Sequence, residues 1–293
     1  MKLIAMAAAL LLLPGCAATP EVFRTQGEAE LWLPDLVSTA TTEVRVTFSP
    51  NGERMLWGAI GRAGGPGGWE IFESVRTATG WSMPHPMSFD SPGNDFDPSF
   101  APDGSGVYFF SNRPGGFGGD DLYFAPFDAQ HGSYGEPRNL GAEVNSAGDE
   151  WAPVVSPDGG KLLFATDGRG GKGKHDLFIA RRVGGVWQHA TNLEAVNSAD
   201  EDFDATFLRD GQSLVFASGD LNGAVDLYFV PARAGRYGAR QRLPEAVNSK
   251  EPDAGTLGPS IAMSDPAHLY FTSHRAVSRG RADIYRIAYS IGK

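Results

Sequence analysis

"VNSAGDEWAPVVSPDGGKLLFATDG", residues 144–168, combines an acidic pair, two prolines, an Asp-Gly turn and an apolar run in one short segment. "SPGNDFDPSFAPDGSGVYFFSN" (91–112) and "VNSADEDFDATFLRDGQSLVFASG" (196–219) match it position for position, and residues 42–59 and 247–273 are looser copies. Self-similarity at a fixed period is the signature of a repeat architecture, in which each copy is one supersecondary unit. The 293-residue chain therefore contains five copies of one unit.

Each copy predicts a four-stranded antiparallel sheet. In the third copy, residues 150–156 lead into the hairpin turn Asp158-Gly159, and "KLLFAT" (161–166) follows as a buried strand. A Gly-rich loop then precedes a third strand, "HDLFIARR" (175–182), and a fourth with an aromatic residue after Gly-Gly. The hairpin position holds Asn51-Gly52, Asp103-Gly104, Asp158-Gly159, Asp210-Gly211 and, off the pattern, Asp265-Pro266.

The last copy lacks a fourth strand. Earlier copies mark this strand with Trp81, Tyr134, Trp187 and Tyr237, and the segment "EAELWLPDLV" (28–37) carries Trp32 before the first copy. A radially repeated sheet must cover its last edge. We therefore expect an all-β fold, a five-bladed β-propeller of four-stranded antiparallel blades, with residues around 30–34 completing the last blade.

The N-terminus, "MKLIAMAAALLLLPGCAATP", predicts a secretory signal peptide. "LLPG" before Cys16 resembles the bacterial lipobox, which implies cleavage before Cys16, a lipid on its thiol and, from Ala17, sorting to the outer membrane. Ordinary cleavage just after Cys16 is the alternative. The expected division is a lipoprotein signal peptide (1–15), a lipidated tether (16–28) and a propeller (29–293), on the periplasmic side of the envelope.

The repeats resemble the TolB-like relatives of the WD repeat, which are marked by a "SPDG" turn, a Gly-rich loop and an Asp-Leu-Tyr strand. The likeness covers residues 43–293, and "EWAPVVSPDGGKLLFATD" and "DFDPSFAPDGSGVYFFSNRPGGFGGDDLYF" are its most specific parts. The resemblance implies an envelope propeller. No α/β domain of the TolB kind precedes the repeats, so the partner contacts of TolB are not carried over.

Charge and motifs narrow the function classes. A formal net charge of −10 without a basic cluster argues against nucleic acid. No Gly-x-Ser-x-Gly or His-Glu-x-x-His motif occurs, and Cys16 is the only cysteine. We expect no enzyme, no cofactor and no metal. The histidines show no metal-ligand spacing and are expected in loops or at the surface: His85, His131, His175, His189, His268 and His274.

The candidate site is one mouth of the propeller channel. Counting from the shared "NS" signal places one acid at the start of each innermost strand: Glu43, Asp95, Glu150, Asp202 and Asp253. The Gly-rich loops emerge on the same face and bring Arg62, Arg113, Arg169 and Arg275, with Trp151 beside an acid. Either each acid is bonded internally, by amides or a loop arginine, or the converging carboxylates bind a cation or a basic peptide segment.

The function expected from this arrangement is recognition of an envelope protein or peptide by a membrane-anchored monomer, at the acidic, loop-rich channel face. Carbohydrate binding through Trp69 and Trp151 is one alternative, and a glycoside hydrolase with paired carboxylates is a weaker one. The acids that open the third strands are expected to tether the Gly-rich loops by backbone hydrogen bonds. These acids are Glu70, Asp121, Asp176, Asp226 and Asp283.

Overall fold

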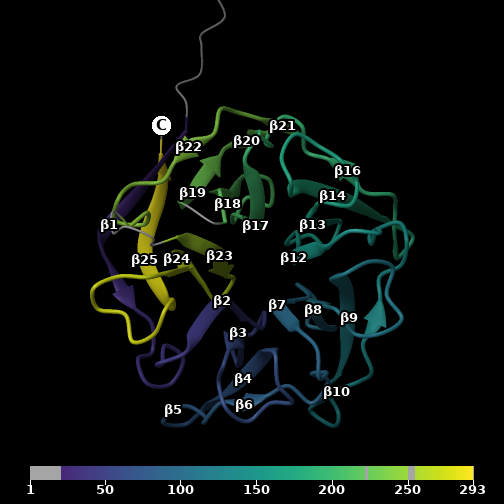
Figure 1. The fold of residues 1–293 in the computed structure, drawn as a ribbon. Coiled ribbons are helices and arrows are strands. Elements are labelled where there is room, and N and C mark those ends of the chain that lie inside the picture. Colours follow the sequence, from purple (N-terminus) through teal and green to yellow (C-terminus); the bar gives the residue numbers. More distant parts are fainter. Residues whose placement is uncertain (1–20, 222–223, 250–254, 293) are drawn as a thin grey trace, which may run out of the picture.

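The computed structural model describes residues 21–221, 224–249 and 255–292. They form five antiparallel sheets around a central axis, with β2, β7, β12, β17 and β23 as the innermost strands (Figure 1). The fold is therefore the expected five-bladed β-propeller. Within the residues described, no helix is long and apolar enough to cross a membrane.

In each of the first four blades, two or three very short strands take the place of one continuous outer strand. The strands of the first blade are β2 (Thr42–Phe48), β3 (Arg54–Ile60), β4 (Trp69–Thr77), β5 (Gly80–Trp81) and β6 (His85–Pro86). Those of the second are β7 (Asp95–Phe100), β8 (Gly106–Ser111), β9 (Asp121–Asp128), β10 (Ser133–Tyr134) and β11 (Arg138–Asn139). Those of the third are β12 (Glu150–Val155), β13 (Lys161–Thr166), β14 (Asp176–Val183), β15 (Val186–Trp187) and β16 (Thr191–Asn192).

The fourth blade has three of these short strands, and the fifth has one continuous outer strand. The fourth contains β17 (Glu201–Phe207), β18 (Leu214–Gly219), β19 (Val225–Val230), β20 (Ala232–Arg233), β21 (Arg236–Tyr237) and β22 (Gln241–Arg242). The fifth contains β23 (Thr256–Ala262), β24 (Asp265–Ser273) and β25 (Asp283–Gly292), completed by β1 (Val22–Leu31). The wheel is therefore closed by joining the two ends of the chain in one sheet (Figure 1).

The N-terminal strand β1 pairs with β25 in antiparallel register, from Val22 opposite Gly292 to Leu31 opposite Tyr285. Trp32 continues the contact, because its N–H donates to the Ile284 carbonyl at 2.7 Å. The predicted closure is confirmed, but the strand begins at Val22, within the segment 16–28 that the sequence assigned to a tether. Within β1 only Phe23 is buried, as expected for a strand at the outer edge of a blade.

Four hairpins turn at the predicted Asn-Gly or Asp-Gly pairs. Gly52, Gly104, Gly159 and Gly211 all have left-handed φ angles, between 66° and 73°. The fifth hairpin differs. Ala262 pairs with Asp265, so the turn is Met263-Ser264, and Asp265-Pro266 begins β24. The expected turn at Asp265-Pro266 is therefore wrong by two residues, because the fifth copy is out of phase with the other four.

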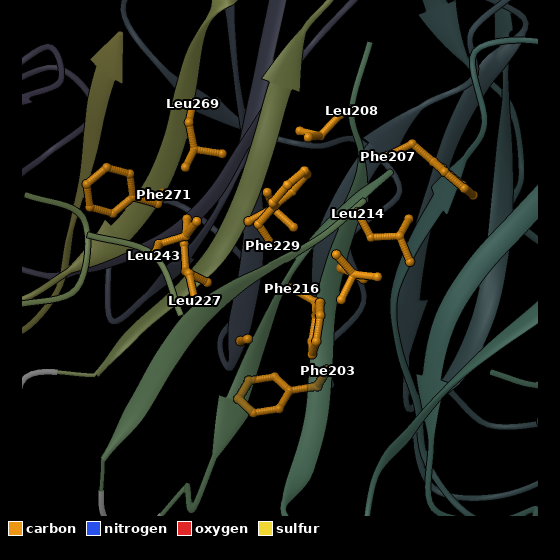
Figure 2. Close-up of a cluster of buried hydrophobic side chains, with 14 of the residues drawn as sticks. Phe203, Phe207, Leu208, Leu214, Phe216, Leu227, Phe229, Leu243, Leu269 and Phe271 are labelled. Atoms are coloured by element: carbon orange, nitrogen blue, oxygen red, sulfur yellow. The ribbon is translucent and has the colours of Figure 1, made fainter. Parts of the chain in front are cut away.

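The second strand of each blade lies between two neighbouring blades, so its side chains are buried on both faces. Every residue of β8 is buried, as are five of the six residues of β18. Figure 2 shows the resulting cluster around the fourth blade, where Phe203, Phe216 and Phe229 lie near Leu269 and Phe271. This apolar packing between blades fixes the loops that the blades carry.

Candidate functional site

Each innermost strand contains a β-bulge two to four residues after its first position. The register of each of these strands shifts against its neighbour at this point. One residue per bulge has a left-handed φ: Arg45 (52°), Asp97 (51°), Ala152 (53°), Asp204 (47°) and Gly258 (58°). The bulge at Gly258 makes Thr256 the fifth equivalent of the acids. Asp253, expected in that place, lies outside the described residues.

The four described acids of the predicted ring, Glu43, Asp95, Glu150 and Asp202, are fully buried. Each accepts a hydrogen bond from the backbone N–H four residues earlier, in the segment that enters the blade. These N···O distances lie between 2.5 and 3.0 Å, and the donors are Thr39, Ser91, Ser146 and Ser198. The carboxylates therefore fasten the connectors between blades to the innermost strands.

Side-chain length decides the second partner of each acid. The two aspartates pair with arginines, Asp95 with Arg113 at 2.6 Å and Asp202 with Arg240 at 3.3 Å. The longer glutamates reach hydroxyl groups instead. Glu43 accepts from Thr39 at 2.6 Å, and Glu150 accepts from Thr166 at 2.7 Å. Burial raises the pKa of Glu43 and of Glu150, and these hydrogen bonds oppose the rise.

The predicted loop arginines are also engaged within the protein. Each donates to carbonyl groups of the preceding connector: Arg62 to Leu36 and Val37, Arg113 to Phe89, Arg169 to Ala142, Val144 and Asn145, and Arg275 to Ala246 and Val247. The loop of the fourth blade has no arginine at this position. Arg240 replaces it from the outer part of that blade, lying 4.3 Å from the Tyr228 ring centre. Binding by the acids and arginines stays a prediction, and a ligand would have to displace these contacts.

The predicted tethering of the Gly-rich loops is confirmed in four blades. Backbone N–H groups of the loop donate to the acid that opens the third strand: Gly67 to Glu70, Phe117 and Gly118 to Asp121, Lys172 and Gly173 to Asp176, and Arg279 and Gly280 to Asp283. In the fourth blade Asp226 pairs with Arg242 at 2.6 Å, and residues 222–223 of its loop lie outside the described residues.

A buried ion pair crosses the channel between two blades that are not neighbours. Arg45 of the first blade lies 3.8 Å from the Asp204 carboxylate of the fourth and donates to the Ala205 carbonyl at 3.0 Å. Burial raises the pKa of Asp97 well above its ordinary value, and the Asp204 charge raises it further. The sequence signal was present, since charged residues interrupt three apolar strands two positions after the acid, but it was not used.

A cavity opens on the hairpin face of the channel, opposite the predicted mouth. Apolar residues of the innermost strands line it, among them Phe48, Phe100, Val154, Phe207 and Ile261. Its volume is about 80 Å³, which suits a few water molecules and not a drug-sized ligand. This cavity was not predicted from the sequence.

Trp151 lies at the loop-rich mouth in a network of polar side chains. Its Nε1 donates to Asp120 at 2.9 Å, and its ring stacks on His175 with 3.8 Å between ring centres. His175 Nδ1 contacts the Glu201 carboxylate at 2.9 Å. His175 is buried, whereas His85, His131, His189 and His274 are exposed. His175 therefore lies in a loop, as expected of the histidines, but its side chain is buried and does not reach the surface.

Exposed apolar side chains occur in the segments that join second and third strands or, for Trp69, at the first position of the third strand. Trp69, Phe117, Leu221 and Val277 are 38%, 52%, 43% and 63% exposed, and each comes from a different blade. Strand direction places these segments on the same face as the starts of the innermost strands. We call these four residues the loop surface. Only Trp69 was noted from the sequence, although an apolar residue within a Gly-rich loop was a usable signal.

Comparisons with known proteins identify the fold. No protein-family model matches the chain, and no curated protein matches it. Among solved structures, TolB from Acinetobacter baumannii is similar with a TM-score of 0.53 at 14% identity, over 86% of this chain and 56% of that one. The putative TolB from Agrobacterium tumefaciens gives 0.51 at 15% identity, over 85% and 83% of the two chains.

An enzyme shares the same fold. The endo-arabinase from Bacteroides thetaiotaomicron gives a TM-score of 0.55 at 12% identity, over 88% of this chain and 96% of that one. This finding corrects the expectation that the chain is not an enzyme, because that expectation rested on missing catalytic motifs, whereas the fold also supports catalysis. At such identities the likeness establishes the fold alone.

Proposed function

We propose that the chain binds a protein or peptide partner of the bacterial envelope through the loop surface. The observation that carries the proposal is the exposure of Trp69, Phe117, Leu221 and Val277, which come from four blades and belong to the same face of the propeller. Loops held by a rigid scaffold are the usual place for recognition, and solvent-exposed apolar groups supply binding free energy when a partner covers them.

The tethers of the loops favour the same conclusion. The loop of the second blade carries Phe117 and is fixed to Asp121 by two backbone hydrogen bonds, and the loop of the fifth carries Val277 and is bonded through Arg279 and Gly280 to Asp283. A partner therefore meets side chains whose backbone is already ordered. Less conformational entropy is lost on binding to such a surface.

A photo-crosslinking amino acid at position 117 or 277, in cells with an intact envelope, tests the proposal. We expect a discrete adduct from both positions, and we expect the double variant F117S/V277S to lose the partner identified in that adduct. The matched control is V183S/V186S, because Val183 and Val186 are each 63% exposed at the turn between β14 and β15, on the opposite face. Adducts from position 183 alone, or equal loss of the partner in both double variants, would contradict the proposal.

We further propose that the chain is exported and held at the periplasmic side of the envelope by a lipid on Cys16. The support is the N-terminal sequence, and Cys16 itself lies outside the described residues. Several acyl chains would give stable anchoring. Mass spectrometry of the mature N-terminus should find acylated Cys16, and Cys16→Ser should move the protein from the membrane fraction to the soluble fraction. A mature chain that starts at Ala17 without lipid would contradict this part.

A further inference from the structure

Three metal-ligand side chains converge at the loop-rich end of the third blade. Asp149 precedes β12, Asp167 follows β13, and His175 precedes β14. One ligand atom from each side chain lies within 4.8 Å of the other two. They come from segments that are separate in sequence, so the fold of the blade brings them together.

His175 carries a nitrogen that the protein does not use. Nε2 is buried and has no hydrogen-bond partner among the described residues, whereas Nδ1 faces the Glu201 carboxylate at 2.9 Å, and His175 is 6% exposed. Buried polar atoms nearly always have a partner, so an orphan of this kind needs an explanation. A carboxylate on Nδ1 sets the tautomer that leaves the Nε2 lone pair free, which is the usual second-shell arrangement of a metal-binding histidine.

The two aspartates are oriented by the backbone and still have oxygen atoms available. Asp149 Oδ1 accepts the Asp120 N–H at 2.9 Å, and Asp167 Oδ1 accepts the Asp149 N–H at 2.8 Å. Asp167 is exposed, so an ion could enter from solvent.

The second blade shows that the fold itself does not need these charges. In that blade Asn94 and Asn112 occupy the equivalent positions, and the Asn94 N–H donates to Asn112 Oδ1 at 2.8 Å. The corresponding bond in the third blade has the same length, with carboxylates in place of amides. The acids therefore exceed what this turn requires, and they occur in the blade that supplies a histidine.

We propose that Asp149, Asp167 and His175 bind one divalent transition-metal ion, with Zn²⁺ as the best fit. One imidazole nitrogen and two carboxylate oxygens suit Zn²⁺, whereas Ca²⁺ prefers six to eight oxygen ligands. Tetrahedral Zn²⁺ would draw the ligand atoms to roughly 3.4 Å from one another, a small movement for the exposed Asp167. Three protein ligands leave one position for water. The ion would join the connector before β12 to the Gly-rich loop of the third blade.

Calorimetry on the full mature chain, freed of metal, tests the proposal with Zn²⁺, Mn²⁺, Ca²⁺ and Mg²⁺ as separate probes. We expect one Zn²⁺ per chain, bound more tightly than Ca²⁺ or Mg²⁺. The double variant D149N/D167N copies the amide pattern of the second blade and should weaken Zn²⁺ binding at least 100-fold. His175→Ala should do the same, and Glu201→Gln should weaken binding about 10- to 100-fold. The control is His189→Ala, an exposed histidine beside Glu143, which should leave the affinity unchanged.

Trp151 supplies a second readout, because its ring stacks on His175. Zn²⁺ should change the tryptophan fluorescence of the native chain, and Trp151→Phe should remove that change while it keeps the affinity within a few-fold. The proposal is overturned by the absence of Zn²⁺ binding at millimolar concentration, by equal Zn²⁺ affinity in the native chain and D149N/D167N, or by tighter binding of Ca²⁺ than of Zn²⁺. If His175→Ala does not fold, the asparagine variant decides, since its hydrogen bonds are preserved.

Discussion

The connectors that follow the first and second blades do the same work with different chemistry. In the second, Asn145 accepts the Leu122 N–H at 2.8 Å and donates to the Leu122 carbonyl at 3.0 Å. In the first, Asp90 accepts the Ile71 N–H at 3.2 Å, and its other carboxylate oxygen has no partner within the described part of the chain. The connector position thus requires a donor and an acceptor, and an ionised aspartate provides only the acceptor.

A connector side chain makes the same pair of hydrogen bonds at each of the remaining junctions between blades. Asn197 bonds to the N–H and the carbonyl of Leu177, and Asn248 bonds to the N–H and the carbonyl of Leu227. At the last junction the Ser38 hydroxyl does this with Ile284. Burial raises the pKa of Asp90 to about 9, so the carboxyl group is protonated at neutral pH. The protonated group can act as the hydrogen-bond donor that this connector position requires.

The largest expected effect on stability is a difference between Arg113 and Arg169, the loop arginines that contact the two connectors. Arg113 pairs with the fully buried Asp95, whereas Arg169 donates only to carbonyl groups. Arg113→Gln should lower the free energy of unfolding by about 3 kcal/mol, because it leaves a buried carboxylate without its cation. Arg169→Gln should cost about 1 kcal/mol. Urea denaturation of both variants measures the difference, and an equal or reversed order would refute this comparison.

A smaller loss of stability is expected when Asn145 of the second connector is replaced by aspartate, the residue at the equivalent position of the first connector. Asn145→Asp removes the donor to the Leu122 carbonyl and places a carboxylate beside the Asn139 side-chain oxygen. We expect a loss of about 2 kcal/mol at pH 8, and a smaller loss near pH 5 as the new carboxyl group takes up a proton. Denaturation midpoints at the two pH values provide the test. A cost that does not change with pH would argue against the donor requirement.

The reverse substitution, Asp90→Asn in the first connector, should stabilise the protein. The ordinary pKa of an aspartate is 3.8, and that of folded Asp90 is about 9. The folded state therefore holds the proton more strongly, so the contribution of Asp90 is complete below pH 4 and is lost as the pH rises towards 9. Asp90→Asn should remove this loss and add at least about 1 kcal/mol at pH 8, with little gain at pH 4.

Thermal unfolding of the Asp90→Asn variant between pH 4 and pH 9 measures this gain. Asp200→Asn is the control, because Asp200 is exposed and precedes a blade in a comparable connector. A stability difference between native chain and Asp90→Asn that stays constant over this range would show that Asp90 does not titrate as described.

The smallest effect is expected at the loop-rich ends of the second and third blades. D149N/D167N should change the stability of the metal-free chain by no more than about 0.5 kcal/mol, because the amides repeat the hydrogen bond between Asn94 and Asn112. Differential scanning calorimetry in the presence of a chelator provides the measurement. A loss of several kcal/mol would mean that the carboxylates are needed for the fold of the third blade.

The parts of the fold that depend on local turn chemistry were predictable from sequence. Short local sequence patterns indicate three of these features: the Asp-Gly hairpins, the acids that tether the Gly-rich loops, and the missing last strand. The phase of the fifth copy was misjudged because its hairpin has Met263-Ser264 in place of Asp-Gly. The start of β1 was placed too late because an outer edge strand with partly buried side chains has little apolar alternation.

The candidate site was less predictable, because its partners meet through space. Arg240 replaces a loop arginine from another part of its blade, and no spacing in the sequence indicates this. His175 is a loop residue, as expected, but Trp151 and Glu201 contact it from the innermost strands of two different blades and its side chain is buried. Some acids are hydrogen-bonded within the protein, and others keep an oxygen atom available to a metal ion. Only the folded arrangement distinguishes the two groups.

The antiparallel pairing of β1 with β25 has a consequence for orientation. Val22 lies opposite Gly292, where β25 reaches the face of the hairpin turns, and it follows Cys16 by six residues. Six extended residues span about 20 Å. With the proposed lipid on Cys16, the wheel would sit close to the bilayer, turn its hairpins towards the headgroups, and direct Phe117 and Val277 outward into the aqueous compartment.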